Sequence, residues 1–267
     1  MAYATVIAIL AIGVCSSRVS SSCPSNCSCP ADTKRVYCIA ASLTSIPLNI
    51  TEDTIDWINL HDNNIQNVLF GASSELGRVR FLDLSYNSIS HIEVGAFNGL
   101  TNLYELRLQN NAITHITAGV FTDCPNLYEL SLYSNDISNI GDGTFTGLVN
   151  LYILWLHGNA IGHIESGAFA QLTTLHYLEL SDNNLTSLPE GVFLPLSRIK
   201  SVDLHGNPWH CNCSLLRWLQ TQNNIHLYDI YCSTPLDHAS QRLNDILPGD
   251  LCTQGNLYLL NLCFGHE

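Results

Sequence analysis

The sequence carries little charge, and positive charge is the scarcer kind. Asp, Glu, Lys and Arg make up 12% of the 267 residues, whereas ordinary soluble domains carry about 25%. The chain has only 10 Lys and Arg but 23 Asp and Glu, which gives a formal net charge of -13. A polyanion is repelled by such a chain. The composition therefore argues against a protein that binds nucleic acids or anionic membranes in general.

Long hydrophobic runs are also lacking. The longest apolar run, residues 4–14, is shorter than the roughly 20 residues that a membrane-spanning helix needs. It lies near the amino terminus and is followed by Cys15, Ser16 and Ser17, which is typical of a secretory signal peptide. We therefore expect residues 1–22 to be a signal peptide, the protein to be secreted and extracellular, and no membrane span to follow, the tail at residues 253–267 included.

Cysteine, by contrast, is abundant. Eleven cysteines and a mean hydropathy of +0.13 exclude disorder, collagen and coiled coil and indicate a globular, disulfide-bearing protein of an oxidising compartment. Eight of the cysteines form two clusters near the ends of the chain. They are Cys23, Cys27, Cys29 and Cys38 in the first cluster and Cys211, Cys213, Cys232 and Cys252 in the second. Sequence alone leaves three connectivities open in each cluster.

An internal repeat dominates the rest of the chain. Asparagines recur every 24 residues, at Asn63, Asn87, Asn111, Asn135, Asn159, Asn183 and Asn207, inside the pattern L-x-x-L-x-L-x-x-N-x-L. This is the leucine-rich repeat pattern. Its alternating core predicts one short strand per repeat, with the leucines pointing inward and the intervening residues facing solvent. Because an amide both donates and accepts hydrogen bonds, the asparagine column can satisfy the backbone where the chain turns off the strand.

A second column confirms this register. Phenylalanine also recurs every 24 residues, at Phe97, Phe121, Phe145, Phe169 and Phe193. We expect these rings to form a buried spine on the convex side. One cycle earlier the slot holds Ser73, so the first turn should be less well packed there.

The repeats predict an α/β leucine-rich repeat solenoid, a horseshoe with a concave parallel β-sheet. Since a solenoid exposes its apolar core at both ends, it needs caps, and the two cysteine clusters mark them. The expected organisation is an amino-terminal cap at residues 23–50, repeats at residues 51–206 and a carboxy-terminal cap at residues 207–252.

Two cysteines remain after the caps and the signal peptide. Cys124 stands where the other repeats carry leucine, so we interpret it as a buried thiol that acts as a small hydrophobe. Cys263 has no partner in the repeats or caps. A leftover cysteine in a secreted protein suggests intermolecular pairing, so a disulfide-linked multimer through Cys263 is our hypothesis.

The register also identifies the side chains that the concave strands display. Large aromatics at solvent-facing strand positions are unusual and indicate a binding surface, although scattered aromatics covered by their neighbours are the alternative. The predicted binding residues are Trp57, Asn59, His61, Phe81, Asp83, Glu105, Arg107, Glu129, Tyr133, Ile153, Trp155, His157, Tyr177 and Glu179. A further column, Tyr104, Tyr128 and Tyr152, lies at the strand entrance, where facing a ligand and packing at the strand edge are equally compatible with the pattern.

Catalytic and metal sites are not expected. Glu179 lies beside Asp203 in neighbouring repeats, but an open sheet offers no pocket that excludes water or raises the pKa of one carboxyl. Glu105 and Glu129 fall short of the six to eight oxygens of a calcium site, and the aligned histidines never supply more than two ligands. We predict no enzyme activity, no cofactor and no metal. Four N-x-S/T sequons occur, and Asn49 and Asn184 are the expected glycosylation sites, because the sequons at Asn26 and Asn212 have a framework cysteine in the middle.

The cysteine spacings resemble the flanking modules of extracellular leucine-rich repeat proteins. That resemblance implies the disulfides Cys23–Cys29, Cys27–Cys38, Cys211–Cys232 and Cys213–Cys252. The layout of caps and repeats, and the segment LTSLPEGVF at residues 185–193, are similar to the variable lymphocyte receptors of jawless vertebrates.

The receptor resemblance implies antigen recognition on the concave strands. The chain has no long insert between Cys213 and Cys232 and no Thr/Pro-rich stalk, so we expect a germline-encoded relative that binds a microbial surface glycan or protein antigen. The alternative is an extracellular matrix, adhesion or guidance protein that binds a fixed host protein through the same face.

Overall fold

The computed structural model describes residues 23–30, 33–47, 55–68, 74–211, 226–227, 230–234 and 238–246. The predicted signal peptide, the tail with Cys263 and the sequon at Asn49 lie outside these residues. Ser73 and the expected Cys213–Cys252 disulfide lie outside them as well.

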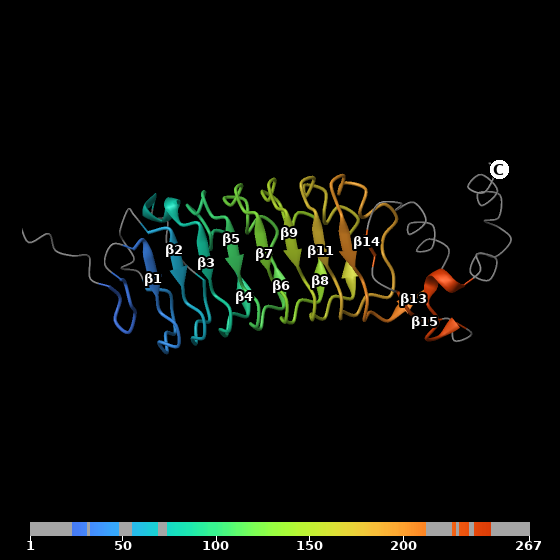
Figure 1. The fold of residues 1–267 in the computed structure, drawn as a ribbon, viewed down its shortest axis with the longest axis horizontal. Helices are drawn as coiled ribbons and strands as arrows, with labels where there is room; N and C mark the ends of the chain where they lie inside the picture. The colour runs from blue at the N-terminus through green and yellow to red at the C-terminus, as the bar shows by residue number, and fades with distance from the viewer. Residues whose placement is uncertain are drawn as a thin grey trace, which may run out of the picture.

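Nine short strands form one parallel sheet and stand side by side along the long axis of the molecule (Figure 1). Equivalent residues of successive repeats pair directly, as Trp57 does with Phe81 and Phe81 with Glu105. The predicted leucine-rich repeat solenoid with a parallel sheet is therefore confirmed. In sheet order the strands are β1 (Arg35–Tyr37), β2 (Trp57–Asn59), β3 (Phe81–Asp83), β5 (Glu105–Arg107), β7 (Glu129–Ser131), β9 (Ile153–Trp155), β11 (Tyr177–Glu179), β12 (Ser201–Asp203) and β14 (His226–Leu227).

The return segments between these strands consist of turns and short parallel strand pairs. Glycines with positive φ, such as Gly95, Gly119 and Gly143, recur in them and interrupt any helical backbone. The described residues contain 3-10 helix but no α-helix, so turns take the place of the α-helices that the expected fold class included. The remaining elements are β4 (His91–Ile92) with β6 (His115–Ile116), β8 (Asn139–Ile140) with β10 (His163–Ile164), β13 (Trp209–His210) with β15 (Cys232–Thr234), and the helices η1 (Ser74–Arg78) and η3 (Leu243–Asp245).

The core is the stack of leucine columns closed on its far side by the phenylalanines. Leu82, Leu106 and Leu130 are fully buried at the middle of their strands. The phenylalanine column is also buried, and the ring of Phe169 stacks 6.0 Å from Phe145 and 5.8 Å from Phe193. The predicted phenylalanine spine is confirmed.

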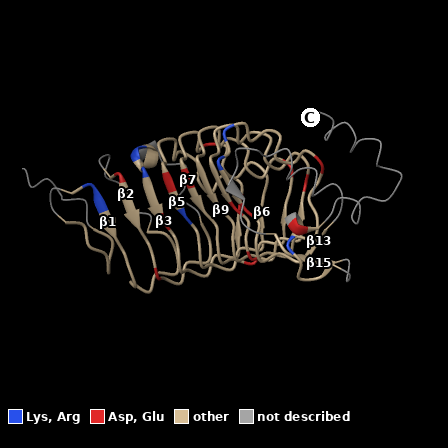
Figure 2. Cartoon of the chain, turned by 45° about the vertical axis from the view of Figure 1, so that its right-hand side comes forward, with Lys and Arg blue, Asp and Glu red and all other residues tan. Residues whose placement is uncertain are grey.

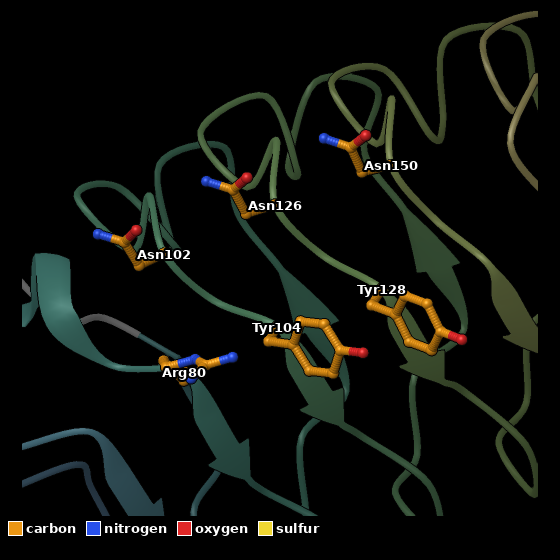
Figure 3. A pocket seen from close by; sticks show the side chains of 6 residues that line it. All are labelled: Arg80, Asn102, Tyr104, Asn126, Tyr128 and Asn150. Atoms are coloured by element: carbon orange, nitrogen blue, oxygen red, sulfur yellow. The ribbon is translucent and has the colours of Figure 1, made fainter.

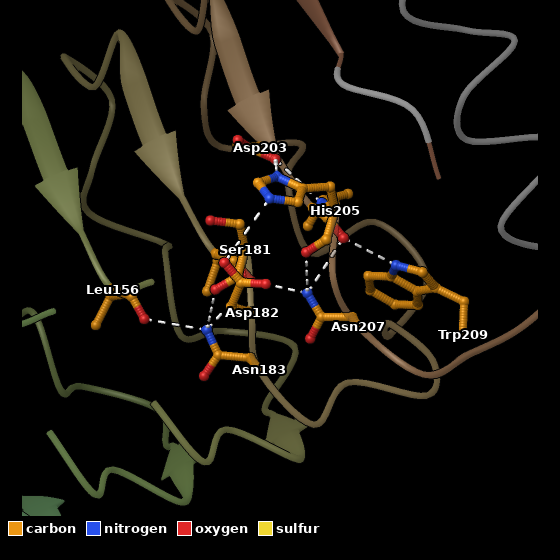
Figure 4. Close-up of polar contacts among 10 residues, drawn as sticks. Leu156, Ser181, Asp182, Asn183, Asp203, His205, Asn207 and Trp209 are labelled. Carbon is orange, nitrogen blue, oxygen red and sulfur yellow. Dashed lines mark hydrogen bonds and ion pairs between the residues drawn. The ribbon is translucent and has the colours of Figure 1, made fainter. Parts of the chain in front are cut away.

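The asparagine column ties each repeat to the one before it. The Asn135 side-chain nitrogen donates to the carbonyls of Leu132, in its own repeat, and of Leu108, in the preceding repeat, each at 3.0 Å. Its oxygen accepts a hydrogen bond from the backbone N–H of Ile113 at 3.0 Å. Equivalent bonds recur along the column up to Asn207 (Figure 4). The predicted role of this column in satisfying the turning backbone is confirmed.

Trp209 ends the asparagine column. The carbonyl of Leu204 accepts from Asn207 of its own repeat at 3.1 Å and from the indole nitrogen of Trp209 at 2.9 Å (Figure 4). In the earlier repeats that second donor is the next asparagine. Trp209 is fully buried, so its ring covers the last repeat while its N–H completes the hydrogen bonding.

Three disulfides lie in the described residues, and all three were implied by the resemblance of the cysteine clusters. They join Cys23 to Cys29, Cys27 to Cys38, and Cys211 to Cys232. Cys124 is a free thiol, fully buried among the leucines, and burial raises its pKa to about 12. The interpretation of Cys124 as a buried substitute for leucine is confirmed.

Candidate binding surface

The outward surface of the nine-stranded sheet is called the sheet face below, and it is the face predicted to be concave. The structure places every predicted binding residue on a strand of this sheet or in the turn that follows it. Tyr177 is exposed, whereas Trp57, Tyr133 and Trp155 are half-buried. The sequence therefore placed these residues on the correct face of the sheet, and ligand binding by that face stays a prediction.

Phe81 and Asp83 correct the expectation that all these side chains face solvent. Phe81 is only 3% exposed and Asp83 only 4%. The ring of Phe81 is covered on both sides by side chains of neighbouring repeats. The Asp83 carboxylate turns back to accept hydrogen bonds from the backbone N–H and the hydroxyl of Ser85, at 2.9 and 2.5 Å. Asn59 likewise accepts from the N–H of His61 at 2.9 Å, so both shape the turn.

At the amino-terminal end of the sheet face, four side chains form a continuous stack. Trp57 and Phe81 stack with centroids 3.5 Å apart. The guanidinium of Arg35 lies 5.0 Å from the Trp57 ring and that of Arg107 lies 4.9 Å from the Phe81 ring. Such cation–π pairs hold both components in place. Arg107 also pairs with Glu105 at 2.7 Å on β5, which carries both signs of charge in Figure 2.

The middle of the sheet face carries a network of aromatic and polar side chains. The Trp155 indole nitrogen donates to Glu129 at 2.8 Å, and His157 stacks on Tyr133 at 4.5 Å. Burial lowers the pKa of His157, so its ring favours the neutral form. The network is thus preorganised, because each ring is held by a partner from an adjacent repeat.

Unpartnered polar atoms are concentrated on the sheet face. Among the described residues, the buried side-chain nitrogens and oxygens without a hydrogen-bond partner are Trp57 Nε1, Gln109 Oε1 and His157 Nδ1. All three belong to columns of the sheet face. Leaving a buried polar atom unpaired costs about 1–3 kcal/mol, so within the described residues the sheet face is where side-chain hydrogen bonding is incomplete.

An acidic cluster occupies the carboxy-terminal part of the sheet face. Burial, reinforced by the charge of Asp203, raises the pKa of Glu179 to about 7. The hydrogen bond with Asp203, 2.7 Å from its ring nitrogen, raises the pKa of His205. The expectation that an open sheet could not raise the pKa of a carboxyl is therefore wrong, since neighbouring side chains desolvate Glu179 without a pocket.

The raised pKa of Glu179 predicts a stability that falls as pH rises. The folded state keeps the Glu179 proton between its ordinary pKa of 4.5 and about 7, whereas the unfolded state releases it, so ionisation in this range destabilises the fold. The side chain is only partly buried, and solvent screening reduces the effect to about 1 kcal/mol. Glu179→Gln should reduce the loss of unfolding free energy between about pH 5 and about pH 8 by this amount, measured by urea denaturation.

Glu190→Gln is the matched control for this measurement, because Glu190 is exposed on a return segment away from the sheet face. This variant should keep the pH dependence of the unmodified chain. An unchanged pH dependence in Glu179→Gln would refute the proposed contribution of that carboxyl.

Sequence reasoning missed Tyr86, which is 51% exposed and contacts His61 edge-on at 4.9 Å. Its φ is 54°, a left-handed conformation that bulky residues rarely adopt. The equivalent residues of other repeats also have positive φ but are short or polar, as Asp62, Asn110 and Ser134 show. The sequence did contain a signal, since Tyr86 stands in a column that otherwise holds Asp, Asn, Ser and Gly. A bulky residue at such a position strains the backbone, and strain of this kind concentrates at functional sites.

The tyrosine column, whose orientation the sequence left open, packs along the strand entrance. Tyr104 stacks on Tyr128 at 4.8 Å and Tyr128 on Tyr152 at 4.7 Å, with nearly parallel rings. Backbone hydrogen bonds between the same residues, such as Tyr128 N–H to Tyr104 at 2.8 Å, continue the sheet to this edge.

Within the described part of the chain, His, Cys, Asp and Glu form no group of three that could hold a metal ion. A search of the same residues finds no helix with the length and apolar character to cross a membrane. Asn184, the expected glycosylation site inside the described residues, is exposed.

A family model for the leucine-rich repeat matches the chain over residues 53–103, 101–161 and 149–208. Leucine-rich repeat-containing protein 3 of Bos taurus is 39% identical over 69 residues, 25% of this chain and 26% of that protein. A phospholipase A2 inhibitor of Gloydius brevicaudus siniticus is 36% identical over 58 residues, 20% of this chain and 17% of that protein.

Among solved structures, the crystal structure of a TLR13–ssRNA13 complex superimposes with a TM-score of 0.57 and 32% identity. The similarity covers 60% of this chain and 22% of that chain. The matched segments thus span about a quarter or less of each of these proteins.

Proposed function

Since the chain belongs to the leucine-rich repeat family, we propose that it is a secreted recognition protein that binds an antigenic surface ligand, a microbial glycan or protein, through the sheet face. The observation that carries this proposal is the location of the unpartnered polar atoms. Trp57 Nε1, Gln109 Oε1 and His157 Nδ1 all lie on this face, beside rings that neighbouring repeats already hold in place. Preorganised aromatic side chains bind with little loss of entropy.

Three further features support the proposal. Disulfides stabilise the described ends of the solenoid and are typical of extracellular proteins. The phospholipase A2 inhibitor and the RNA-bound TLR13 structure are named for proteins that bind a ligand. The similarity of the caps and of residues 185–193 to variable lymphocyte receptors favours an immune ligand over a matrix partner.

Trp155→Ala and Tyr177→Ala should each weaken ligand binding by about 2 kcal/mol, or about 30-fold, as truncation of an interface aromatic commonly does. Trp155 lies at the centre of the face and Tyr177 is its most exposed ring among the predicted positions. The full chain is tested on an array of bacterial glycans, host extracellular proteins and single-stranded RNA, and affinities for any bound component are then measured by surface plasmon resonance.

Leu194→Ala is the control, because Leu194 is 81% exposed on a return segment and its truncation should leave binding unchanged. Equal affinity of the unmodified chain and both aromatic variants would remove the sheet face as the binding site. Selective binding of a host matrix protein would instead support the adhesion or guidance role, and selective binding of RNA would contradict the expectation drawn from the net charge.

The choice between an immune and a fixed partner is tested by sequencing transcripts from several individuals. An immune receptor should vary at the sheet-face columns while its leucine and asparagine columns stay constant. Invariance of the sheet face would favour a fixed host ligand.

A further inference from the structure

A second candidate site lies at the strand-entrance edge, beside the sheet face rather than on it. An open cavity of about 670 Å³ runs across three repeats there, between a row of asparagines and a row of tyrosines (Figure 3). This volume lies in the range of about 300–1,000 Å³ that is typical of small-molecule sites. Its lining residues, called the edge site below, are Arg80, Asn102, Tyr104, Asn126, Tyr128 and Asn150.

The tyrosine rings of the edge site have no free face, and neither does Tyr152, the next ring of their column. Tyr104, Tyr128 and Tyr152 cover one another at 4.7–4.8 Å. The guanidinium of Arg80 covers the outer face of Tyr104 at 5.6 Å, and His176 covers that of Tyr152 at 4.0 Å. A ligand that binds by stacking, such as a nucleobase, needs an open aromatic face. The edge site therefore offers ring edges and hydroxyl groups instead.

The asparagines are held in a fixed orientation. The side-chain nitrogens of Asn102, Asn126 and Asn150 donate to backbone carbonyls of the preceding repeat, at 2.5, 2.8 and 2.9 Å. All three side chains are exposed, and no hydrogen bond within the described residues reaches their amide oxygens. These oxygens form a row of preorganised acceptors with the spacing of the strands, about 4.8 Å.

The tyrosines supply the complementary donors. Within the described residues the hydroxyls of Tyr104, Tyr128 and Tyr152 make no hydrogen bond. Burial and the neighbouring tyrosines raise the pKa of Tyr128, so its hydroxyl stays protonated at neutral pH. Although the chain has a net charge of -13, no carboxylate lines the edge site, and Arg80 is its one charged lining residue.

We propose that the edge site binds a short, hydroxyl-rich oligosaccharide. Sugar hydroxyls donate to the amide oxygens and accept from the tyrosine hydroxyls, and a chain of linked sugar rings can follow the two rows across the repeats. Because no carboxylate lines the site, a weakly acidic sugar is not repelled by its lining either. The covered ring faces favour this hydrogen-bonded ligand over stacked nucleic acid.

The test uses the full chain, a uridine oligonucleotide and four tetrasaccharides: cellotetraose, laminaritetraose, chitotetraose and mannotetraose. NMR titration of the tyrosine ring resonances reports both affinity and location. At least one tetrasaccharide should shift the Tyr104 and Tyr128 resonances. The double variant Tyr104→Phe, Tyr128→Phe keeps the stacked rings but removes two hydroxyls, so it should bind about tenfold more weakly.

Tyr231→Phe is the matched control, because it removes a hydroxyl from a tyrosine that is 52% exposed and outside both proposed sites, and it should leave tetrasaccharide affinity unchanged. Binding that is lost in Trp155→Ala but kept in the double variant would overturn the edge site and place the sugar on the sheet face. Failure of all four tetrasaccharides to bind, or binding of a uridine oligonucleotide at the tyrosines instead, would overturn the oligosaccharide assignment. Failure of the tetrasaccharides to bind would leave ligand binding by the sheet face standing, because the array measures that binding separately.

Discussion

Replacement of Asn135 by alanine is expected to lower the free energy of unfolding by about 3 kcal/mol, although it removes only one uncharged side chain. The buried N–H of Ile113 loses its acceptor, and the carbonyls of Leu108 and Leu132 each lose one of two donors. An orphaned buried backbone group costs about 1–3 kcal/mol, and the shared carbonyls add to this. The effect should appear as a lower urea midpoint with an unchanged m-value.

Asn139→Ala is the control, since Asn139 is exposed in β8 and lies just after the same turn. Its replacement should change stability by no more than about 0.5 kcal/mol. If both variants lost the same amount, the loss would reflect asparagine content rather than the hydrogen bonds of the column. The Asn135 side-chain nitrogen also donates to the backbone carbonyl of Tyr133 at 3.3 Å. Loss of this hydrogen bond should weaken ligand binding by the sheet face as well.

The repeat could be predicted in detail because the physical role of each recurring residue follows from its position within a single repeat. A leucine at every second strand position must be buried, and an amide at a turn must satisfy backbone groups. Asn135 and Phe169 therefore occupy the places that spacing alone assigned to them. Cys124 was interpretable for the same reason, since a fully buried slot accepts a small apolar side chain.

The sheet face was predictable as a face but not in its details. Alternation along a strand determines which way a side chain points, whereas its exposure depends on the residue beside it in the next repeat. Phe81 is buried because Trp57 and Arg107 happen to flank it. The raised pKa of Glu179 likewise depends on Asp203, one strand away. The residue types in such pairs between neighbouring strands do not recur every 24 residues, so the repeat pattern cannot predict the pairs.

The two proposed sites follow from the same architecture. A solenoid brings equivalent residues of successive repeats within about 4.8 Å of one another. Where those residues differ, as on the sheet face, the result is an irregular surface suited to one ligand. Where they repeat, as Asn and Tyr do at the edge site, the result is a periodic row of donors and acceptors suited to a polymer.

Phe169→Ala is expected to have the largest effect on stability, about 4 kcal/mol, as buried phenylalanine truncations commonly do. The ring is fully buried and stacks on both Phe145 and Phe193, so its loss opens a cavity and separates the first part of the spine from the last. Leu194→Ala is the control, because Leu194 directly follows Phe193 in the sequence but is 81% exposed. This variant should lower the free energy of unfolding by less than about 0.5 kcal/mol.

The position of the lost ring also predicts how the variant unfolds. In a solenoid each repeat contacts only its neighbours, so stability is a sum of repeat and interface contributions. Weakening the interface on both sides of Phe169 should let the carboxy-terminal repeats open before the rest. Hydrogen exchange should then show faster exchange at Leu180 and Ser201, whose amides bond across repeats, than at Leu84. Uniform acceleration along the chain would mean that the spine is not divided at Phe169 and that the solenoid unfolds as one cooperative unit.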